Sequence, residues 1–114
     1  MLKRTIEIGI LFDYYGNLLT NKQKKIVELY YYQDLSLGEI AENLEISRQG
    51  VYDHLHRAED TLKSYEQELK LVKRNKKNIE IIKKLLEFVK NDDDLKERTR
   101  DFLIDQLNEM NKNI

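Results

Sequence analysis

The sequence predicts an all-α protein in which a helix-turn-helix unit of four helices continues, through a long fourth helix, into a C-terminal helical hairpin. Three observations carry this prediction. The 114 residues include no proline and only four glycines, which disfavours a fold rich in turns. Apolar residues recur at helical spacings of three and four along most of the chain. Four segments begin with an N-capping serine, threonine or aspartate.

The first two helices are expected on either side of a short connection. The first runs from about Leu2 to Tyr15, and Gly16 after it suits a left-handed C-terminal cap. The expected apolar face of this helix is widened by Leu11 and has apolar residues at every fourth position: Leu2, Ile6, Ile10 and Tyr14. Thr20 and Gln23 have the spacing of a capping box, so the second helix is expected to begin near Asn21.

The third and fourth helices follow closely. Ser36 and Glu39 form a second capping box, which predicts a short helix from Leu37 to about Asn43. Ser47 is then expected to cap a fourth helix that continues to about Lys76, roughly 45 Å long at 1.5 Å per residue. Apolar residues spaced alternately by four and three form a heptad seam along it: Val51, Leu55, Ala58, Leu62, Tyr65, Leu69 and Val72. The distal members are expected to pack against a second copy or the downstream helices: Leu62, Tyr65, Leu69 and Val72.

Two further helices complete the predicted hairpin. Apolar residues at helical spacing from Ile79 to Val89 predict a fifth helix that ends near Asn91. Asp94 and Glu97 have the spacing of a capping box that opens a sixth helix.

These helices group into two expected domains. Residues 1–66 form the helix-turn-helix domain, with its motif at about 36–58, and residues 67–114 form a C-terminal helical extension that packs on the long helix. No basic-then-apolar leader opens the chain, and no apolar run approaches the roughly 20 residues of a membrane span. We therefore expect a cytoplasmic protein without membrane insertion.

The net charge of −1 conceals a strong segregation of charge along the chain. Basic and acidic residues number five and four in residues 1–36, three and seven in 37–66, eight and three in 67–90, and four and seven in 91–114. The helix-turn-helix region is therefore acidic, and the most basic segment lies beyond it. Within that segment, a basic stripe able to attract a polyanion is formed by Lys70, Lys73, Arg74, Lys76 and Lys77.

The most informative segment runs from Ser36 to Ala58, where two capped helices separated by a short turn have the pattern of a helix-turn-helix motif. In this motif the first residues of the second helix meet base edges in the major groove. Arg48 can pair with guanine and Gln49 with adenine, while hydroxyl and basic side chains touch phosphates. The predicted nucleic-acid-binding residues are Ser47, Arg48, Gln49, Tyr52, Asp53 and Arg57.

Several residues in this segment depart from the pattern of a DNA-reading motif. Glu45 occupies the turn position that glycine often holds in a left-handed conformation. Gly50 lies inside the expected reading helix and weakens it by up to about 1 kcal/mol relative to alanine. Asp53, Glu59 and Asp60 would repel the phosphates if they faced them. The motif is therefore also compatible with binding a protein.

Catalytic and metal chemistry find little support in the residue pattern. The chain has no cysteine, and His54 and His56 lack the four-residue spacing of a helical metal pair. No phosphate-binding glycine loop or nucleophile motif is present. We therefore expect no metal, no cofactor and no enzymatic activity.

From Thr20 to Leu62 the chain resembles the fourth region of bacterial sigma factors, with N-capping Ser36 followed by EIA, L, IS, V and a terminal RA. A wider segment is similar to YlxM-like proteins, a small bacterial family; it is LFDYYGNLLTNKQKKIVELYYYQDLSLGEIAENLEISRQGVYDHLHRAEDTLKSYEQELKL, Leu11 to Leu71. This resemblance implies a sigma-like regulatory helix-turn-helix protein tied to the signal recognition particle pathway. The implied partners are the RNA of the particle and its GTPase subunit.

Three functions follow from these observations. The leading hypothesis is a regulatory protein of the signal recognition particle pathway that contacts the particle's RNA or GTPase subunit. The second is a DNA-binding transcriptional regulator that places its fourth helix in the major groove. The third is a dimeric protein-interaction adaptor assembled through the heptad seam. Because helix-turn-helix proteins often pair, a homodimer is expected.

Overall fold

In the computed structural model, which describes residues 2–113, the chain is helical and has no strand within that range, as expected for an all-α protein. It forms two compact units, residues 1–72 and 73–114. Their boundary lies six residues beyond the one expected from the sequence. Residues 1 and 114, the outer ends of the two expected domains, lie outside the described range.

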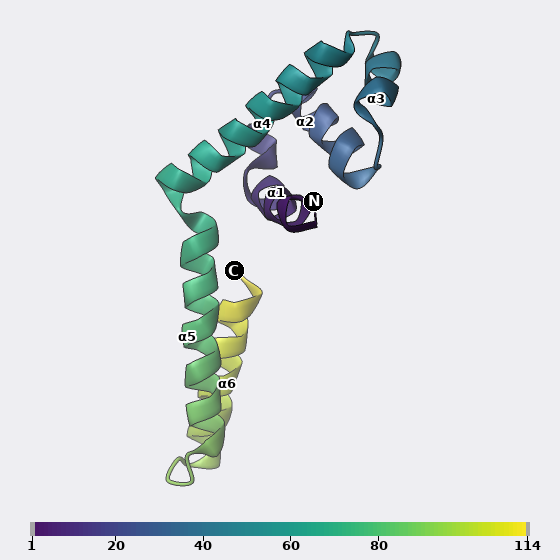
Figure 1. Cartoon of the computed structure of the whole chain (residues 1–114). Coiled ribbons are helices and arrows are strands. Elements are labelled where there is room, and N and C mark those ends of the chain that lie inside the picture. Colours follow the sequence, from purple (N-terminus) through teal and green to yellow (C-terminus); the bar gives the residue numbers. More distant parts are fainter. Residues whose placement is uncertain (1, 114) are drawn as a thin grey trace. The chain divides into compact units, whose positions relative to one another are not determined.

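The N-terminal unit holds the helix-turn-helix motif (Figure 1). Its elements are α1 (Leu2–Tyr15), a 3₁₀ turn (Gly16–Leu18), α2 (Asn21–Val27), a π-helical turn (Glu28–Tyr32), α3 (Leu37–Leu44) and α4 (Arg48–Leu69).

Both capping boxes predicted for this unit form. The Thr20 hydroxyl accepts from the Gln23 N–H at 3.2 Å, and the Ser36 hydroxyl accepts from the Glu39 N–H at 3.1 Å. In return the Ser36 N–H donates to the Glu39 carboxylate, which lowers the pKa of that side chain.

The core of the N-terminal unit is built around α4. Its fully or almost fully buried members come from every helix of the unit: Ile8, Leu11, Tyr15, Leu19, Ile26, Val27, Leu29, Ile40, Val51, Leu55, Ala58 and Leu62. The first four residues of the predicted heptad seam therefore pack inside their own unit. Burial of these side chains supplies the hydrophobic free energy that holds the motif together.

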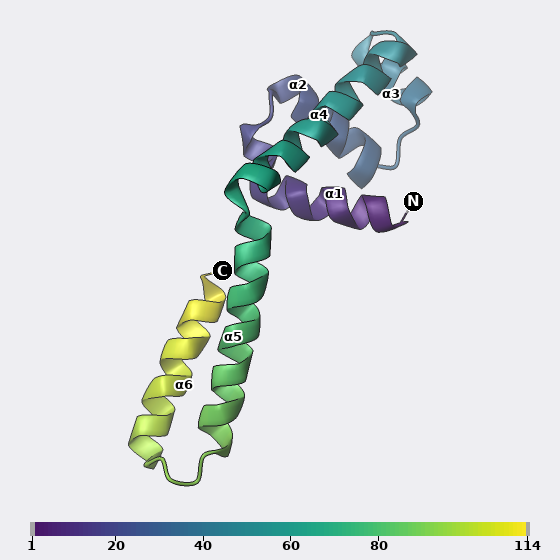
Figure 2. The same ribbon diagram turned by 60° about the vertical axis from the view of Figure 1, so that its left-hand side comes forward.

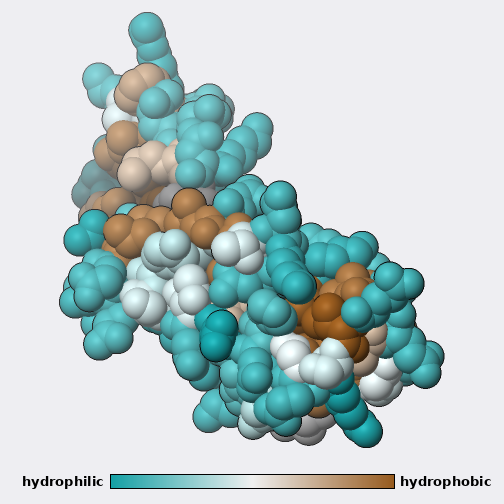
Figure 3. Space-filling model, turned by 90° about the horizontal axis from the view of Figure 1, so that it is seen from above, coloured by the Kyte–Doolittle hydropathy of each residue, from teal (hydrophilic) through white to brown (hydrophobic). Residues whose placement is uncertain are grey.

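The apolar face predicted for α1 is wrong except at Leu11. Ile8, Leu11 and Tyr15 are the buried residues of this helix, whereas the other four residues of the predicted face are exposed by 38–74%: Leu2, Ile6, Ile10 and Tyr14. At 3.6 residues per turn these two sets lie on opposite sides of α1. The helix is apolar on both sides, and the sequence does not reveal which one meets α4. Figure 3 shows exposed apolar side chains as brown patches on a mainly hydrophilic surface.

The expected left-handed cap at Gly16 is also wrong, since the described glycines all have negative φ. Gly16 instead opens the 3₁₀ turn and is buried. A Cβ at this position would lie 3.0 Å from the ring of Phe12. Glycine is therefore favoured here by close packing rather than by backbone conformation.

The long fourth helix is shorter than predicted. It ends at Leu69, and Lys70 adopts a left-handed conformation with φ of 56°. A new helix, α5 (Leu71–Asn91), begins immediately. The N–H of Leu71 donates to the Tyr15 hydroxyl at 3.1 Å, and the N–H of Val72 donates to Glu66 at 3.1 Å. These side chains satisfy two donors that a continuous helix would bond internally.

The C-terminal unit is a hairpin of α5 and α6 (Glu97–Lys112), which run antiparallel side by side in both views (Figures 1 and 2). The predicted capping box at Asp94 does not form. Lys96 is the N-cap of α6 and makes no capping bond through its side chain. Asp92 instead accepts from the Asp94 N–H within the turn, and the Arg100 guanidinium bonds the carbonyls of Val89 and Asp92. The turn is closed by these bonds, so α6 begins two residues late.

Candidate nucleic-acid interface

The helix-turn-helix geometry depends on three residues between α3 and α4. Glu45 takes the left-handed conformation, with φ of 56° and ψ of 40°, which allows the chain to leave α3. Its cap N–H bonds carbonyls at the end of that helix. Ser47 then caps α4, because its hydroxyl accepts from the Gly50 N–H at 2.9 Å. The turn position that often holds glycine thus has the conformation typical of glycine, although a glutamate occupies it.

The six predicted nucleic-acid-binding residues lie at or near the start of α4, and all are exposed: Ser47, Arg48, Gln49, Tyr52, Asp53 and Arg57. Val51 and Leu55 alternate with them and are buried by 97% or more. The helix therefore turns its apolar stripe to the core and presents the predicted binding residues to solvent. This arrangement is the one by which a recognition helix enters the major groove.

Two contacts order this exposed surface. The Gln49 amide donates to the Asp53 carboxylate at 3.0 Å, which leaves its second N–H and its oxygen for other partners. The rings of Tyr52 and His56 lie 4.3 Å apart, one turn along the helix. Both pairs have the spacing at which helical side chains meet.

Gly50 has a structural role at the start of α4. A Cβ at this position would lie 3.0 Å from the Ser47 hydroxyl oxygen, which caps the helix. The small residue leaves the cap undisturbed. This partly offsets the propensity penalty that glycine brings to a helix.

The acidity of the motif is smaller at the surface than the sequence suggests, because Glu59 points inward. Its side chain is 3% exposed and forms an ion pair with the Arg4 guanidinium. The Tyr31 hydroxyl donates to its second oxygen at 2.7 Å. Burial is the main cause that raises the pKa of Tyr31, and the hydrogen bond to Glu59 adds to it. The same carboxylate raises the pKa of Arg4. Glu59 therefore does not face a bound phosphate.

Sequence reasoning missed this network, although a signal was present. Glu59 lies four residues after Leu55 and three before Leu62, within the buried stripe of α4. A carboxylate in such a stripe requires a cation or hydrogen-bond donors. The sequence does not identify Arg4 as the cation, because 55 residues separate the two.

A second unpredicted cluster lies where α4 meets α5. The Tyr15 hydroxyl donates to Glu66 at 2.6 Å and accepts from the Leu71 N–H. Burial is the main cause that raises the pKa of Tyr15, and the hydrogen bond to Glu66 adds to it. Its ring stacks on Tyr65 at 5.9 Å. One α1 residue therefore holds the break between the two helices.

The predicted seam is divided by that break. Leu62 is fully buried, and Tyr65 and Val72 pack against the core of the N-terminal unit. Leu69 is 44% exposed. Because Leu62 is enclosed within its own unit, the seam as predicted does not offer a continuous surface to a second copy.

The predicted basic stripe is exposed throughout: Lys70, Lys73, Arg74, Lys76 and Lys77. Lys70 forms the break itself, and the other four occupy the first two turns of α5. The positive end of a helix macrodipole lies at its N-terminus. The cations therefore add to the positive potential there, which increases the attraction for an anion.

Within residues 2–113 no group of three or more His, Asp or Glu side chains is arranged to hold a metal ion. No helix in that range is long and apolar enough to cross a membrane.

Residues 2–102 match the family described as "Putative helix-turn-helix protein, YlxM / p13 like". The chain belongs to the YlxM/p13-like family. It is 55% identical over 80 residues to a UPF0122 protein of Caldanaerobacter subterraneus subsp. tengcongensis, covering 70% of this chain and 68% of the relative. A UPF0122 protein of Halalkalibacterium halodurans is 48% identical over 89 residues, covering 78% and 82%. One from Bacillus cereus strain AH187 is 40% identical over 100 residues, covering 88% and 91%. The YlxM/p13-like description is that of a helix-turn-helix protein and names no enzymatic activity.

Proposed function

We propose that this YlxM/p13-like protein is a cytoplasmic regulator that binds duplex DNA through the start of α4. The observation that carries the proposal is the exposure of Arg48 and Gln49 directly after the capped turn. Arg48 would bind the O6 and N7 atoms of guanine. Gln49 would bind adenine through its amide oxygen and an N–H. Tyr52 and Arg57, on the next turns, would contact phosphates.

The charges around the motif support selective rather than strong binding. Glu59 is paired inside the unit, but Asp53 and Asp60 are exposed on the same helix. Exposed carboxylates lower affinity for any phosphate backbone, whereas base contacts still discriminate between sequences. We therefore expect weak general affinity for DNA and a clear preference for particular sites.

The test is a selection from random duplexes followed by a binding titration. The variant Arg48→Ala/Gln49→Ala is expected to lose the sequence preference, at about 1–3 kcal/mol for each bidentate contact. The control, Lys63→Ala/Gln67→Ala, likewise removes one cation and one glutamine, farther along α4, where both are also exposed. An unchanged preference in the first variant would exclude DNA reading by α4.

A second function is favoured by the basic stripe and by the resemblance to YlxM-like proteins, which implies a link to the signal recognition particle pathway. In this proposal the protein regulates that pathway, and the cations of α5 bind the particle's RNA or an acidic surface of its GTPase subunit. The stripe carries four cations within five residues, Lys73 to Lys77, at a helix N-terminus. Each phosphate contact contributes to a steep salt dependence of RNA binding.

Two pairs of adjacent lysines on α5 provide a matched test of this second function. Lys76→Ala/Lys77→Ala is expected to weaken RNA binding and reduce the salt slope by about two. Lys83→Ala/Lys84→Ala removes the same charge farther along the helix and is expected to have a smaller effect. Equal losses would indicate general electrostatic attraction, and no loss would exclude the stripe as the RNA site. Capture of the GTPase with and without nuclease distinguishes direct protein contact from contact through RNA.

A further inference from the structure

The C-terminal hairpin leaves several large apolar side chains uncovered. Only Ile82 and Val89 are buried on α5, and α6 has no buried residue in its described range. Five large apolar side chains are exposed by 45–68%: Ile81, Leu85, Phe88, Phe102 and Met110. A pair of helices encloses little apolar surface, so further packing would add to its stability.

These exposed side chains share one side of the hairpin. Ile81, Leu85 and Phe88 are spaced by four and three residues, so they form a stripe along one flank of α5. At 3.6 residues per turn, Phe102 and Met110 fall on the corresponding flank of α6. Antiparallel helices turn corresponding flanks to the same side. We call these five residues the hairpin face.

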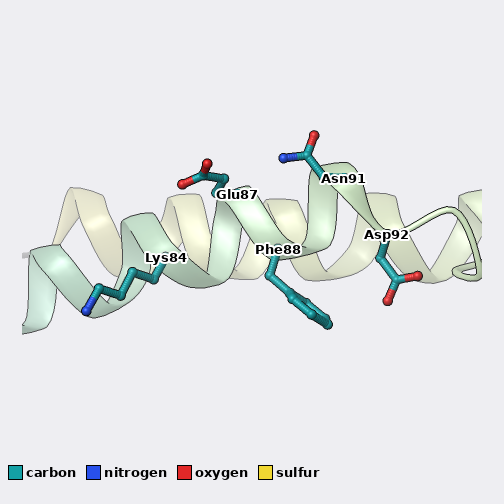
Figure 4. Close-up of a pocket in the computed structure, with 5 residues that line it drawn as sticks. All are labelled: Lys84, Glu87, Phe88, Asn91 and Asp92. Carbon is teal, nitrogen blue, oxygen red and sulfur yellow. The ribbon is translucent and has the colours of Figure 1, made fainter.

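The centre of the hairpin face is poor in charge, in a chain with 36% charged residues. Asn78, Thr99 and Gln106 on the same flanks are uncharged, and the charged residues Arg74, Lys77 and Asp92 lie toward its two ends. Lys84 lies at its rim beside Phe88, and the two border a surface hollow of about 360 Å³. Figure 4 shows Phe88 and Asp92 projecting from one side of α5, away from Glu87 and Asn91. Depletion of charge around aromatic residues is typical of the centre of a protein interface.

We propose that the hairpin face docks against the same face of a second copy, so that the C-terminal units form a four-helix dimerisation module. The area is sufficient. At about 200 Å² for each large apolar side chain, the exposed fractions amount to about 550 Å² per copy and about 1,100 Å² per dimer, near the lower limit for a specific interface. A face that meets itself also closes the assembly at two copies.

The charges at the two ends of α5 favour an antiparallel arrangement. Arg74 lies near the start of α5, on the flank that carries the hairpin face, and Asp92 directly follows Asn91, the last residue of the helix. Antiparallel packing of two α5 helices about residue 83 sets Ile81 against Leu85 of the second copy. The same register sets Arg74 opposite Asp92 of the second copy, twice in each dimer. Complementary end charges fix register and orientation in this way.

The test measures the mass of the whole chain in solution by sedimentation equilibrium, without nucleic acid. The wild type is expected at twice its monomer mass of 13.7 kDa. Phe88→Lys is expected to raise the dimer dissociation constant about 100-fold or more, since both copies lose a central aromatic side chain. The control Glu80→Lys places the same residue on the charged side of α5 and is expected to remain dimeric. Because Phe88 is 68% exposed in the monomer, its loss leaves the monomer's helical content unchanged.

A charge exchange tests the register independently. Arg74→Glu is expected to weaken the dimer about tenfold, and adding Asp92→Arg to the same chain is expected to restore it. A wild type that is monomeric at the highest accessible concentration would overturn the proposal. An unchanged dimer in both Phe88→Lys and Leu85→Lys would also overturn it. A monomer in which the exposed side of α1 covers the hairpin face would do the same. None of these outcomes depends on whether the protein binds DNA or RNA.

Discussion

The ion pair between Arg4 and Glu59 provides the sharpest test of the N-terminal unit. The Glu59 side chain is 3% exposed and that of Arg4 is 46% exposed. Arg4→Met removes the cation and retains much of the side-chain length. The carboxylate then keeps only the hydrogen bond from Tyr31, at 2.7 Å. The variant therefore leaves a buried negative charge without its counter-ion.

The size of the effect follows from the geometry. Removing one partner of a fully buried pair costs about 3–5 kcal/mol. Arg4 is half-exposed, so water reaches the vacated side of the carboxylate, and Tyr31 continues to donate. We therefore expect a loss of about 2 kcal/mol in the free energy of unfolding. For a unit of this size the midpoint of thermal unfolding would fall by about 8–16 °C.

The assay uses tyrosine, because all seven tyrosines lie between residues 14 and 65. The tyrosine band of the near-UV circular dichroism spectrum, followed apart from the bands of Phe88 and Phe102, therefore reports on the N-terminal unit during urea unfolding. Lys3→Met, which replaces an exposed neighbouring cation, is the control and is expected to change stability by less than about 0.5 kcal/mol. Adding Glu59→Gln to Arg4→Met should recover part of the loss, since it removes the uncompensated charge. Equal stability of Arg4→Met and Lys3→Met would refute the reasoning.

Three further predictions concern the same unit and the same tyrosine signal. The pKa of Tyr31 is raised above 10.0 on folding, so the stability that it contributes is complete below that pH and is lost as the pH rises further. Urea unfolding of Tyr31→Phe should show lower stability at neutral pH but a shallower decline between about pH 10 and 12; parallel curves would contradict the assignment. Glu45→Gly should stabilise the unit by about 0.5 kcal/mol, because glycine adopts the left-handed conformation without strain. The control Glu42→Gly, inside α3, should destabilise the unit by about 1 kcal/mol. If the two variants changed the free energy of unfolding in the same direction, this explanation would be excluded. Ser36→Ala should cost about 1 kcal/mol through the lost cap, and the exposed mid-helix control Ser64→Ala no more than a few tenths; equal costs would remove the cap as the cause.

Helix starts were predicted well from the sequence because they depend on residues close together in the chain. The side chains of Thr20, Ser36 and Ser47 each bond a backbone N–H three residues away. The same locality explains why the helix-turn-helix segment and its exposed residues could be recognised. Asp94 had the same pattern but failed as a cap, because Arg100 bonds the end of α5 and closes the turn differently.

Which face of α1 is buried could not be read from its own residues. The helix carries one apolar stripe through Ile6 and Ile10 and another through Ile8 and Leu11. Packing against α4 chose the second, and the same orientation brings Arg4 to Glu59. A pattern within one helix establishes that a face is apolar. Only the neighbouring helix decides whether that face is covered.

The sequence by itself determined the helical class, the capped motif and the separation of an acidic region from a basic one. The tertiary structure decided where the long helix breaks. The heptad spacing continues through Lys70 without proline or glycine, so local propensity favours one continuous helix. Tyr15 lies 51 residues before Glu66 in the chain, and the two side chains bond each other. Together they accept hydrogen bonds from the N–H groups of Leu71 and Val72, and these bonds favour the break over a continuous helix. Contacts between residues so far apart in the chain form only on folding, and they outweigh the local preference.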